Sequence, residues 1–404
     1  MKNMKKIYIF ILIINIILLV GCSKGSKNYK SGMKAFEAGD YEVAASELSE
    51  AINQDPEEND YYLAYGDVLI ALEEYEEAIN YFEQVITDED KKEDKENNKK
   101  AYYGIGISFY YMEQYNNAIE QFNKAISIEV LKDWDVDILE YKADAQLQAS
   151  LYMEAKDAFD TLIDMDDGVG QFYKKRAIVY KELGDYEKAM EDIDMAIELE
   201  PSNYGYYFDK YFILVDLNEE DEAKVTLQST MNIEANDETD RFNNAKANYY
   251  LENYDEAFEG FTDTFKEGVE ESNYYLARIM EQKGDLEGAI SYYKEFLLLQ
   301  TKEHDISSYY FALSYNQLGY CYLELGNFEE ALSNFNIGLS LEQPLLERVL
   351  LKNKVIALES LNDFEEAYEL LQEYILLYPE DDDAIRELEF VTTRLPEASP
   401  QLEE

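Results

Sequence analysis

The chain has 404 residues, and its length, composition and charge already exclude several classes of protein. Hydrophobic residues make up 47% of it and charged residues 30%, which is enough apolar material for a packed core. Only 18 glycines and 6 prolines are present, so turn-rich β-sandwiches and collagen-like chains are disfavoured and a helical protein is expected. The 87 acidic and 35 basic residues give a formal net charge of -52, which would repel nucleic acid phosphates. Nucleic acid is therefore excluded as a partner.

Cysteine and histidine are scarce, which limits the chemistry that the chain can carry. Its two cysteines are Cys22 and Cys321, and its one histidine is His304. If Cys22 is modified as argued below, no intrachain disulfide can form. Cys321 lies between Tyr320 and Tyr322 and is expected to be a buried, unreactive thiol, because no histidine is close in sequence to activate it. We therefore predict no catalytic residue, no metal site and no cofactor.

The N-terminus has the pattern of a secretory signal. Lys2, Lys5 and Lys6 precede an apolar stretch at residues 7–20, which has the length of a signal-peptide core and is short for a membrane span. The stretch is followed by glycine and then by Cys22. This ending resembles the bacterial lipobox, in which the cysteine receives diacylglycerol and becomes the mature N-terminus. The alternative is an uncleaved anchor with an incidental cysteine.

The resemblance to a lipobox implies how the N-terminal segments are used. Residues 1–21 are expected to be a lipoprotein signal peptide, and 22–27 a short lipidated tether with two or more acyl chains, such as palmitate, at Cys22. A basic stretch begins where the chain would meet anionic lipid headgroups, and its lysines are Lys24, Lys27, Lys30 and Lys34. The alternative is that these lysines only solubilise the tether. The implied location is a bacterial membrane or cell envelope, outside the cytoplasm.

A short motif recurs through almost the whole mature chain. The sequence Gly-Asp-Tyr-Glu at residues 39–42 returns at 184–187, and weaker versions occur elsewhere. An alanine stands three residues after the tyrosine position of each copy, and successive alanines are 32 to 42 residues apart. These ten marker alanines are Ala44, Ala78, Ala118, Ala155, Ala189, Ala223, Ala257, Ala289, Ala331 and Ala367. Self-similarity at this interval is typical of repeat architectures.

Three further positions are defined relative to each marker alanine. The residue three before it is bulky and apolar in nine of the ten copies, and the residue four after it is large and apolar in all ten. These spacings place the three residues on one face of a helix. The residue twelve before the alanine is small in eight copies, which would let a preceding helix approach closely. Each copy is therefore predicted to be a pair of helices.

Two short helices per copy, with small, small and large aromatic positions about 34 residues apart, resemble the tetratricopeptide repeat. The resemblance covers nearly all of the mature chain, and we assign residues 28–383 to ten such repeats. It implies an all-α fold: a right-handed α-solenoid of helix-turn-helix repeats whose first helices line a concave groove. The segment 384–404 is expected to hold a capping helix, starting at Asp383 and ending at Leu395, and a disordered acidic tail. The apolar residues that would cover the end of the stack are Ala384, Leu388 and Val391.

Some segments depart from the regular pattern. Residues 87–100 carry charged and polar side chains, with no apolar residue after Thr87, and we expect a plain charged connector, either a loop or a solvated helix extension. An insertion at 301–308 leads into aromatic residues that should lengthen the first helix of the ninth copy, and His304 would lie in its loop. The acidic run 164–168 is expected to be a polar turn, because its residues are out of register for a calcium loop. Trp134 is expected to pack between the third and fourth copies.

The resemblance implies that five positions of each first helix face the groove, namely those 18, 15, 11, 8 and 7 residues before the marker alanine. Of these fifty positions twelve are acidic and six basic, so the groove is not specially acidic. Twelve are aromatic, a higher share than the 14% of the whole chain. They are Tyr29, Phe36, Tyr103, Tyr110, Tyr111, Phe208, Phe212, Phe242, Tyr249, Tyr250, Tyr274 and Tyr320. We predict that the nine from Tyr103 to Tyr274 are exposed anchors for a partner; the alternative is that several are core residues.

These patterns favour two functions of different classes. The first is a noncatalytic, lipid-anchored scaffold on the outer face of a bacterial membrane that holds an extended peptide or protein partner in its groove, for example in envelope or secretion assembly. The second is a receptor for a glycan or small ligand, or an accessory subunit of an envelope enzyme. The resemblance favours a protein partner, whereas the richness in tyrosine favours neither.

Overall fold

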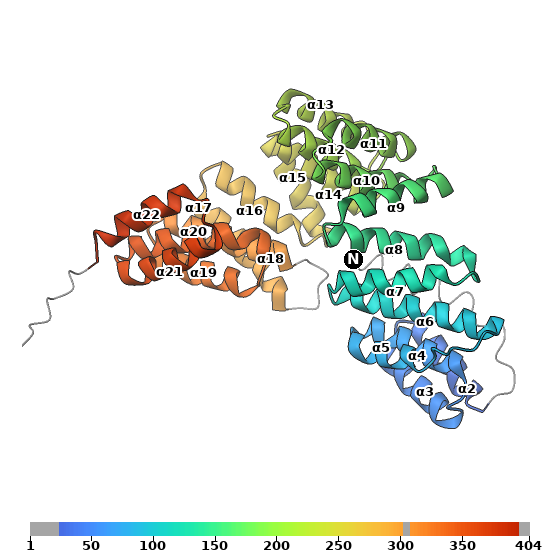
Figure 1. The fold of residues 1–404 in the computed structure, drawn as a ribbon. Coiled ribbons are helices and arrows are strands. Elements are labelled where there is room, and N and C mark those ends of the chain that lie inside the picture. Colours follow the sequence, from blue (N-terminus) through green and yellow to red (C-terminus); the bar gives the residue numbers. More distant parts are fainter. Residues whose placement is uncertain (1–23, 302–307, 396–404) are drawn as a thin grey trace, which may run out of the picture. The chain divides into compact units, whose positions relative to one another are not determined.

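The computed structural model describes residues 24–301 and 308–395, and every regular element within them is a helix (Figure 1). This confirms the predicted all-α fold. The signal peptide, Cys22, His304 and the C-terminal tail lie outside the described residues.

The described helices follow one another along the chain as two helices for each marker alanine, ten pairs in sequence order, as predicted. The first five pairs are α2 (Ser26–Glu37) and α3 (Tyr41–Gln54), α4 (Asn59–Ala71) and α5 (Tyr75–Glu83), α6 (Lys92–Tyr111) and α7 (Tyr115–Ser127), α8 (Asp135–Gln148) and α9 (Tyr152–Met165), and α10 (Gly170–Glu182) and α11 (Tyr186–Leu199). The last five are α12 (Tyr204–Asp216) and α13 (Glu220–Thr230), α14 (Glu238–Tyr250) and α15 (Tyr254–Lys266), α16 (Ser272–Gln282) and α17 (Leu286–Leu297), α18 (Ser308–Glu324) and α19 (Phe328–Ser340), and α20 (Pro344–Ser360) and α21 (Phe364–Leu377). Helix α22 (Asp382–Thr392) follows them, and two short 3-10 helices, η1 (Lys132–Trp134) and η2 (Leu298–Thr301), lie between pairs.

The core of each copy is built from the positions that define the repeat. All ten marker alanines are fully buried. The large residue four after the alanine packs against the small residue twelve before it: a Cβ added to Gly66 would lie 2.6 Å from the Phe82 ring, and one added to Gly106 would lie 2.5 Å from the Phe122 ring. The prediction that small residues permit close approach of the two helices is confirmed.

The turn inside each copy has one fixed conformation. The residue five before the marker alanine has a positive φ, between 59° and 82°, in all ten copies. The next residue donates its backbone N–H to the carbonyl oxygen five residues earlier, as in the 2.9 Å bond from Asp40 to Ala35, which closes the first helix with a Schellman-type turn. The ten residues are Gly39, Glu73, Glu113, Ser150, Gly184, Asn218, Glu252, Gly284, Gly326 and Asn362. Glycine is present in only four of them, so six copies form a left-handed turn without it.

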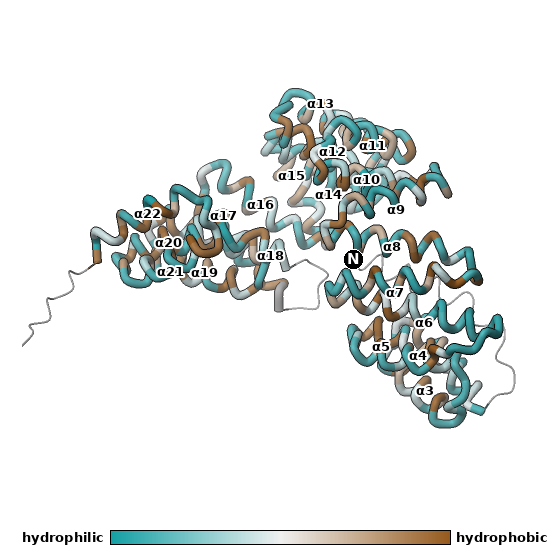
Figure 2. The backbone as a smooth tube through the Cα atoms, in the orientation of Figure 1, coloured by the Kyte–Doolittle hydropathy of each residue, from teal (hydrophilic) through white to brown (hydrophobic). Residues whose placement is uncertain are grey.

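The chain divides into two compact units, residues 1–219 and 220–404, which are described separately below. The division falls inside the sixth copy, where the sequence departs most from the repeat: Tyr211 replaces a small residue and Glu220 replaces an apolar one. In the first unit, the first helices contact one another in order, α2 with α4, α4 with α6 and α6 with α8; in the second, α14 contacts α16 and α18 contacts α20. Along the described helices, hydrophobic residues are interspersed with hydrophilic ones (Figure 2).

The charged insertion at 87–100 is only partly solvated, which corrects the prediction of a plain connector. Helix α6 begins at Lys92, so the insertion does extend a helix, but Lys99 near its end is fully buried. The Lys99 Nζ donates to the carbonyl oxygens of Ile128, at 3.2 Å, and Val130, at 2.8 Å, and forms an ion pair with Asp135. A lysine can be buried in this way because carbonyl oxygens and a carboxylate replace its water.

Three smaller predictions on these connections are confirmed. Trp134 is buried, with its ring centroid 5.9 Å from that of Tyr103 in the third copy, and it belongs to a core cluster that includes Ile138 and Tyr141 of the fourth. Helix α18 of the ninth copy is lengthened to 17 residues. The turn expected at 164–168 is present at 166–168, where the Asp166 side chain accepts from the backbone N–H of Gly168 at 3.0 Å, whereas Asp164 and Met165 still belong to α9.

The expected capping helix is α22, but it begins earlier than predicted and ends at Thr392 instead of Leu395. Asp381, not Asp383, is its N-cap, and its side chain accepts from the backbone N–H of Ala384 at 3.3 Å. The cap lies two residues earlier because Asp381 is also fixed by Tyr374, whose hydroxyl donates to it at 2.6 Å, and by an ion pair with Lys352 at 2.7 Å. Ala384 and Val391 are buried against the tenth copy, and Leu388 packs there too, as predicted.

Candidate partner-binding surface

The predicted groove positions, here called the first-helix face, are those 18, 15, 11, 8 and 7 residues before each marker alanine. Three of the nine proposed anchors on this face are buried: Tyr103 is 2% exposed, Phe208 6% and Tyr274 7%. Tyr29 and Phe36 are buried as well. The prediction that Tyr103, Phe208 and Tyr274 are exposed is therefore wrong. The alternative, that several of the aromatic residues are core residues, is correct for these three and for Tyr29 and Phe36.

The buried positions have a common cause. Tyr29, Tyr103 and Tyr274 all stand fifteen residues before a marker alanine, where each packs on an aromatic residue of the next copy. The ring-centroid distances are 5.1 Å from Tyr29 to Tyr61, 6.1 Å from Tyr103 to Tyr141 and 5.5 Å from Tyr274 to Tyr310. An apolar residue at this position therefore joins consecutive first helices instead of meeting a partner.

Other residues of the first-helix face are open to a partner. Phe212, on α12, is 40% exposed, and Tyr320, on α18, is 42% exposed. Two aliphatic residues of α20 on the same face, Val349 and Ile356, are 40% and 45% exposed. The remaining predicted anchors are half-buried; they are Tyr110, Tyr111, Phe242, Tyr249 and Tyr250.

In the first unit, the predicted tyrosines pack around Tyr141, which was not among the predicted residues. Tyr141 of α8 lies 5.7 Å from Tyr110 and 6.1 Å from Tyr103, measured between ring centroids, and Tyr110 lies 5.6 Å from Tyr111. These contacts join α6 and α8. The result is a cluster of tyrosines with only part of Tyr110 and Tyr111 at the surface.

The second unit contains a similar cluster around Tyr275 of α16. Its ring centroid lies 5.6 Å from those of Phe242 and Tyr249, both on α14, and 5.1 Å from that of Tyr274. Tyr249 in turn lies 5.3 Å from Tyr250. Four predicted residues of the seventh and eighth copies therefore lie in one cluster, but its central residue, Tyr275, was not predicted. The four are Phe242, Tyr249, Tyr250 and Tyr274.

Tyr141 and Tyr275 share one register position, fourteen residues before the marker alanine, and this position carries contacts to the preceding first helix in other copies too. There Lys175 reaches Glu140 and Asp144, Gln317 reaches Glu281, and Asn353 donates to Asn316. The signal available in the sequence was a long polar or aromatic side chain at this position in the fourth, fifth, eighth, ninth and tenth copies; these residues are Tyr141, Lys175, Tyr275, Gln317 and Asn353.

The carboxylates of α8 on the first-helix face differ in their partners. Lys175 Nζ lies 2.5 Å from Asp144 Oδ2 and 3.1 Å from Glu140 Oε1, so one lysine serves two carboxylates. Burial raises the pKa of Asp144, although the positive charge of Lys175 opposes the shift. Burial, with the nearby Glu140, raises the pKa of Asp137 to about 6. Asp137 therefore holds its negative charge at neutral pH at a cost in stability.

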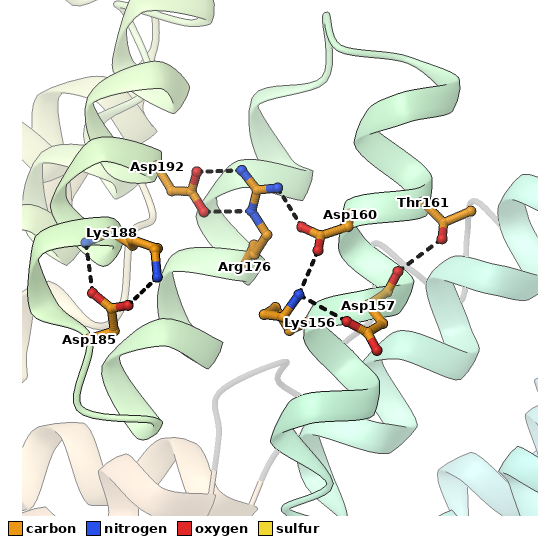
Figure 3. A network of polar contacts seen from close by, with 8 residues as sticks. All are labelled: Lys156, Asp157, Asp160, Thr161, Arg176, Asp185, Lys188 and Asp192. Carbon is orange, nitrogen blue, oxygen red and sulfur yellow. Dashed lines mark hydrogen bonds and ion pairs between the residues drawn. The ribbon is translucent and has the colours of Figure 1, made fainter.

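A second polar network joins α9 of the fourth copy with α10 and α11 of the fifth (Figure 3). Arg176 of α10 donates two hydrogen bonds to Asp192 of α11, at 2.8 and 2.7 Å, and one to Asp160 of α9, at 2.6 Å. Lys156 donates to Asp160 from the same helix at 2.7 Å. Burial alone would raise the pKa of Asp160, but the hydrogen bonds from Lys156 and Arg176 outweigh burial and lower that pKa. Lys156, Asp160, Arg176 and Asp192 therefore all have partners of opposite charge, and the network fixes the packing of α9, α10 and α11.

The chemistry of the remaining candidate residues is limited. Cys321 is buried, as predicted, and burial together with the charge of Glu281, 3.4 Å from its Sγ, raises the pKa of the thiol. Within 24–301 and 308–395, no group of three or more histidine, cysteine, aspartate or glutamate side chains is arranged to hold a metal ion. None of the helices in these ranges is both long enough and apolar enough to cross a membrane.

The chain is similar to known repeat proteins. Models of the tetratricopeptide repeat match residues 29–94, 99–129, 171–203 and 269–340. A TPR repeat-containing protein of Methanocaldococcus jannaschii is 27% identical over 180 residues, which are 43% of this chain; the match spans only 30% of the length of that protein.

Solved structures with similar folds are more distant in sequence. A tetratricopeptide repeat protein from Parabacteroides merdae is 16% identical with a TM-score of 0.48, over 65% of this chain and 99% of that one. YrrB, described as a TPR protein with an unusual peptide-binding site, is 19% identical with a TM-score of 0.38, over 45% of this chain and 90% of that one. With four matching models and the same left-handed turn residue in all ten copies, the chain is built from tetratricopeptide repeats.

Proposed function

We propose that the protein is a noncatalytic interaction scaffold that binds an extended segment of a protein partner along its first-helix faces. The observation that carries this proposal is the exposure of large apolar side chains on these faces. Phe212, Tyr320, Val349 and Ile356 are each 40% exposed or more. Exposed apolar and aromatic residues of this kind supply most of the binding energy at protein interfaces.

The proposal is tested first on two exposed aromatic residues, one in each unit. We expect Phe212→Ala or Tyr320→Ala to weaken binding of a partner captured from solubilised membranes by about 1–3 kcal/mol, because each change removes an exposed aromatic anchor. Binding is measured with the purified partner by surface plasmon resonance. The tyrosine pairs 110–111 and 249–250 are less suitable, because they also pack within the core clusters.

The matched controls are exposed apolar residues on second helices. Val43 of α3 is 54% exposed and Val225 of α13 is 59% exposed. Val43→Ala and Val225→Ala should leave partner binding unchanged. If these controls weakened binding as much as the first-helix variants, the partner would bind elsewhere and the proposal would be wrong.

We further propose that the protein is held on the outer face of a bacterial membrane by a lipid on Cys22. The support comes from the signal-like residues 1–22 and from the basic start of the repeat region. Lys27, Lys30 and Lys34 are all exposed and spaced along one side of α2, where they can meet anionic headgroups.

Cys22→Ala is expected to abolish lipid attachment and signal cleavage at this site, because the thiol that accepts the lipid is removed. Metabolic labelling with an alkyne palmitate, followed by electrophoresis, detects both effects. Cys321→Ala is the control and should be labelled like the unmodified chain. A labelled and processed Cys22→Ala protein would contradict the proposal.

The rival function, a glycan or small-molecule receptor, receives little support from two cavities of the described residues. One cavity of about 230 Å³ lies at the turn between α19 and α20, and another of about 110 Å³ lies beside α22. Pockets for small molecules usually measure about 300–1,000 Å³. Neither cavity coincides with the clusters of tyrosines.

A further inference from the structure

The guanidinium of Arg278, on the first-helix face of α16, donates no hydrogen bond to any residue that the structure describes. Its side chain is only 23% exposed, and its Nε atom is buried without a hydrogen-bond acceptor. Its nearest charged neighbour is Glu281, three residues further along α16, with 3.3 Å between Nε and Oε2. A guanidinium carries five N–H donors, and donors in partly buried places are normally paired. Arg278 therefore has donors available for a group from outside the chain.

Glu281 holds Arg278 in place without satisfying it. The Glu281 carboxylate also receives the Nε2 atom of Gln317, at 3.4 Å, and the Sγ atom of Cys321, at 3.4 Å, and both of these residues belong to α18. Arg176 in the first unit is a useful contrast, because it donates three hydrogen bonds to two carboxylates and has little left to offer. Arg278 has one ion pair and no such hydrogen bonds, so most of its donors await an acceptor.

The register position of Arg278 is one that is open to a partner in other copies. Arg278 stands eleven residues before its marker alanine, and the residues at this position in the sixth, ninth and tenth copies are Phe212, Tyr320 and Ile356, each at least 40% exposed. The seventh and eighth copies carry the two basic residues found at this position, Lys246 and Arg278. Positive charge is therefore placed on the first-helix face where α14 and α16 lie next to each other.

Tyrosine rings border Arg278 on the same face. Tyr274 precedes it by one turn of α16, and Tyr249 lies on α14, the first helix that contacts α16. Both rings pack on Tyr275, with centroids 5.1 Å and 5.6 Å from it. Rings at these places reduce the access of water, which strengthens a charge-assisted hydrogen bond. The planar fork of a guanidinium matches the two oxygens of a carboxylate, so this is the group that the site would hold best.

We infer that Arg278 binds the side-chain carboxylate of an aspartate or glutamate inside the extended segment of the partner. The first-helix face continues on both sides of Arg278, to Tyr249 of α14 and Tyr320 of α18, so the segment passes this residue instead of ending there. Neighbouring first helices lie about 9 Å apart, which an extended chain covers in about three residues. The acidic residue is therefore about three residues from the apolar residue that meets Tyr320. This inference rests on the proposed function, since it names the chemistry of the partner at the same face.

The test uses the full mature chain and three fluorescein-labelled peptides of nine residues, built from serine and glycine with one leucine. The glutamate peptide has a glutamate three residues before the leucine and ends in an amide. The glutamine peptide is the same with glutamine in place of glutamate. The third peptide is the glutamine peptide with a free C-terminal carboxylate, so it separates a chain end from an internal side chain as the source of the carboxylate. Binding is measured by fluorescence anisotropy.

We expect the unmodified chain to bind the glutamate peptide about tenfold more tightly than either of the other two. Arg278→Gln with Glu281→Gln should abolish this preference, and it leaves neither charge of the pair buried alone. Glu281→Gln by itself should strengthen binding of the glutamate peptide about threefold, because the guanidinium loses its competing carboxylate. The charge-matched controls are Lys266→Gln with Asp263→Asn, and Asp263→Asn alone, in an ion pair of α15 whose side chains are 67% and 71% exposed. Neither control should change the preference.

A glutamate peptide that binds no better than the glutamine peptide, whether both bind or neither does, would overturn the inference. So would a preference that survives the double change, weaker binding by Glu281→Gln, or a carboxylate-ended peptide that binds like the glutamate peptide. Partner binding that still depends on Phe212 and Tyr320 would in those cases leave the proposed function standing. Conversely, a glutamate preference that depends on Arg278 would support the inference even if the Phe212 and Tyr320 variants bound the captured protein normally, in which case only the proposed role of those two residues would fail.

Discussion

Replacing Arg176 with alanine is expected to lower the free energy of unfolding by about 2–3 kcal/mol. The side chain of Asp192 is only 7% exposed and accepts two hydrogen bonds from Arg176. Without the guanidinium, this carboxylate would stay buried and ionised with no cation to offset its desolvation. The loss is measured by urea denaturation, followed by circular dichroism, of a chain that begins at Ser23.

The control for this prediction is an ion pair at the surface. Lys132 and Glu129 lie 2.8 Å apart, with side chains 65% and 83% exposed. Lys132→Ala should leave the denaturation midpoint almost unchanged, because exposed pairs are well solvated with or without each other. A midpoint for Arg176→Ala equal to that of the control would mean that the Arg176 network does not fix the fourth and fifth copies together.

Gly106→Val is expected to destabilise the third copy by about 3 kcal/mol. A Cβ at this position would lie 2.5 Å from the ring of Phe122, which is fully buried and cannot turn away. The helices α6 and α7 would have to separate, which would expose the core between them. Adding Phe122→Leu should recover part of the loss, because the smaller side chain makes room for the valine.

The matched control is Asn123→Val, at the next residue of α7, which is exposed. This change introduces the same β-branched side chain into a helix without a clash, and should cost about 0.5 kcal/mol or less. Both variants are compared in urea by circular dichroism. Similar midpoints for Gly106→Val and Asn123→Val would refute the close packing that we describe for the repeat.

The ten helix pairs could be predicted from the sequence because local spacing determines them. In eight of the ten copies a small residue, an alanine and a large apolar residue stand at fixed separations, and they contact one another within a single copy, as Gly106 and Phe122 do. Such short-range contacts leave a periodic trace in the chain. The capping helix was also predictable, although its first residue was displaced by the long-range partners of Asp381.

The binding face could be predicted only in part, because its exposure depends on contacts between copies. A tyrosine such as Tyr103 suits both a solvent-facing surface and a core, and its burial is decided by Tyr141 and Trp134 of the next copy. The burial of Lys99 is a similar case: the carbonyl groups that receive it belong to residues 128 and 130, about thirty positions further along the chain. No local sequence pattern predicts these contacts between residues that are far apart in the chain.

The fixed left-handed turn also explains where the copies differ in length. Since the residue five before each marker alanine always ends the first helix in the same way, added residues accumulate upstream of it. The lengthened helices α6 and α18 both gain their extra residues at the start, and the paired positions after the turn keep their spacing. Each copy therefore has a constant part, from the turn onward, and a part of variable length before the turn. Insertion, duplication or loss of sequence between copies can then change the length of the array without changing the packing within a copy.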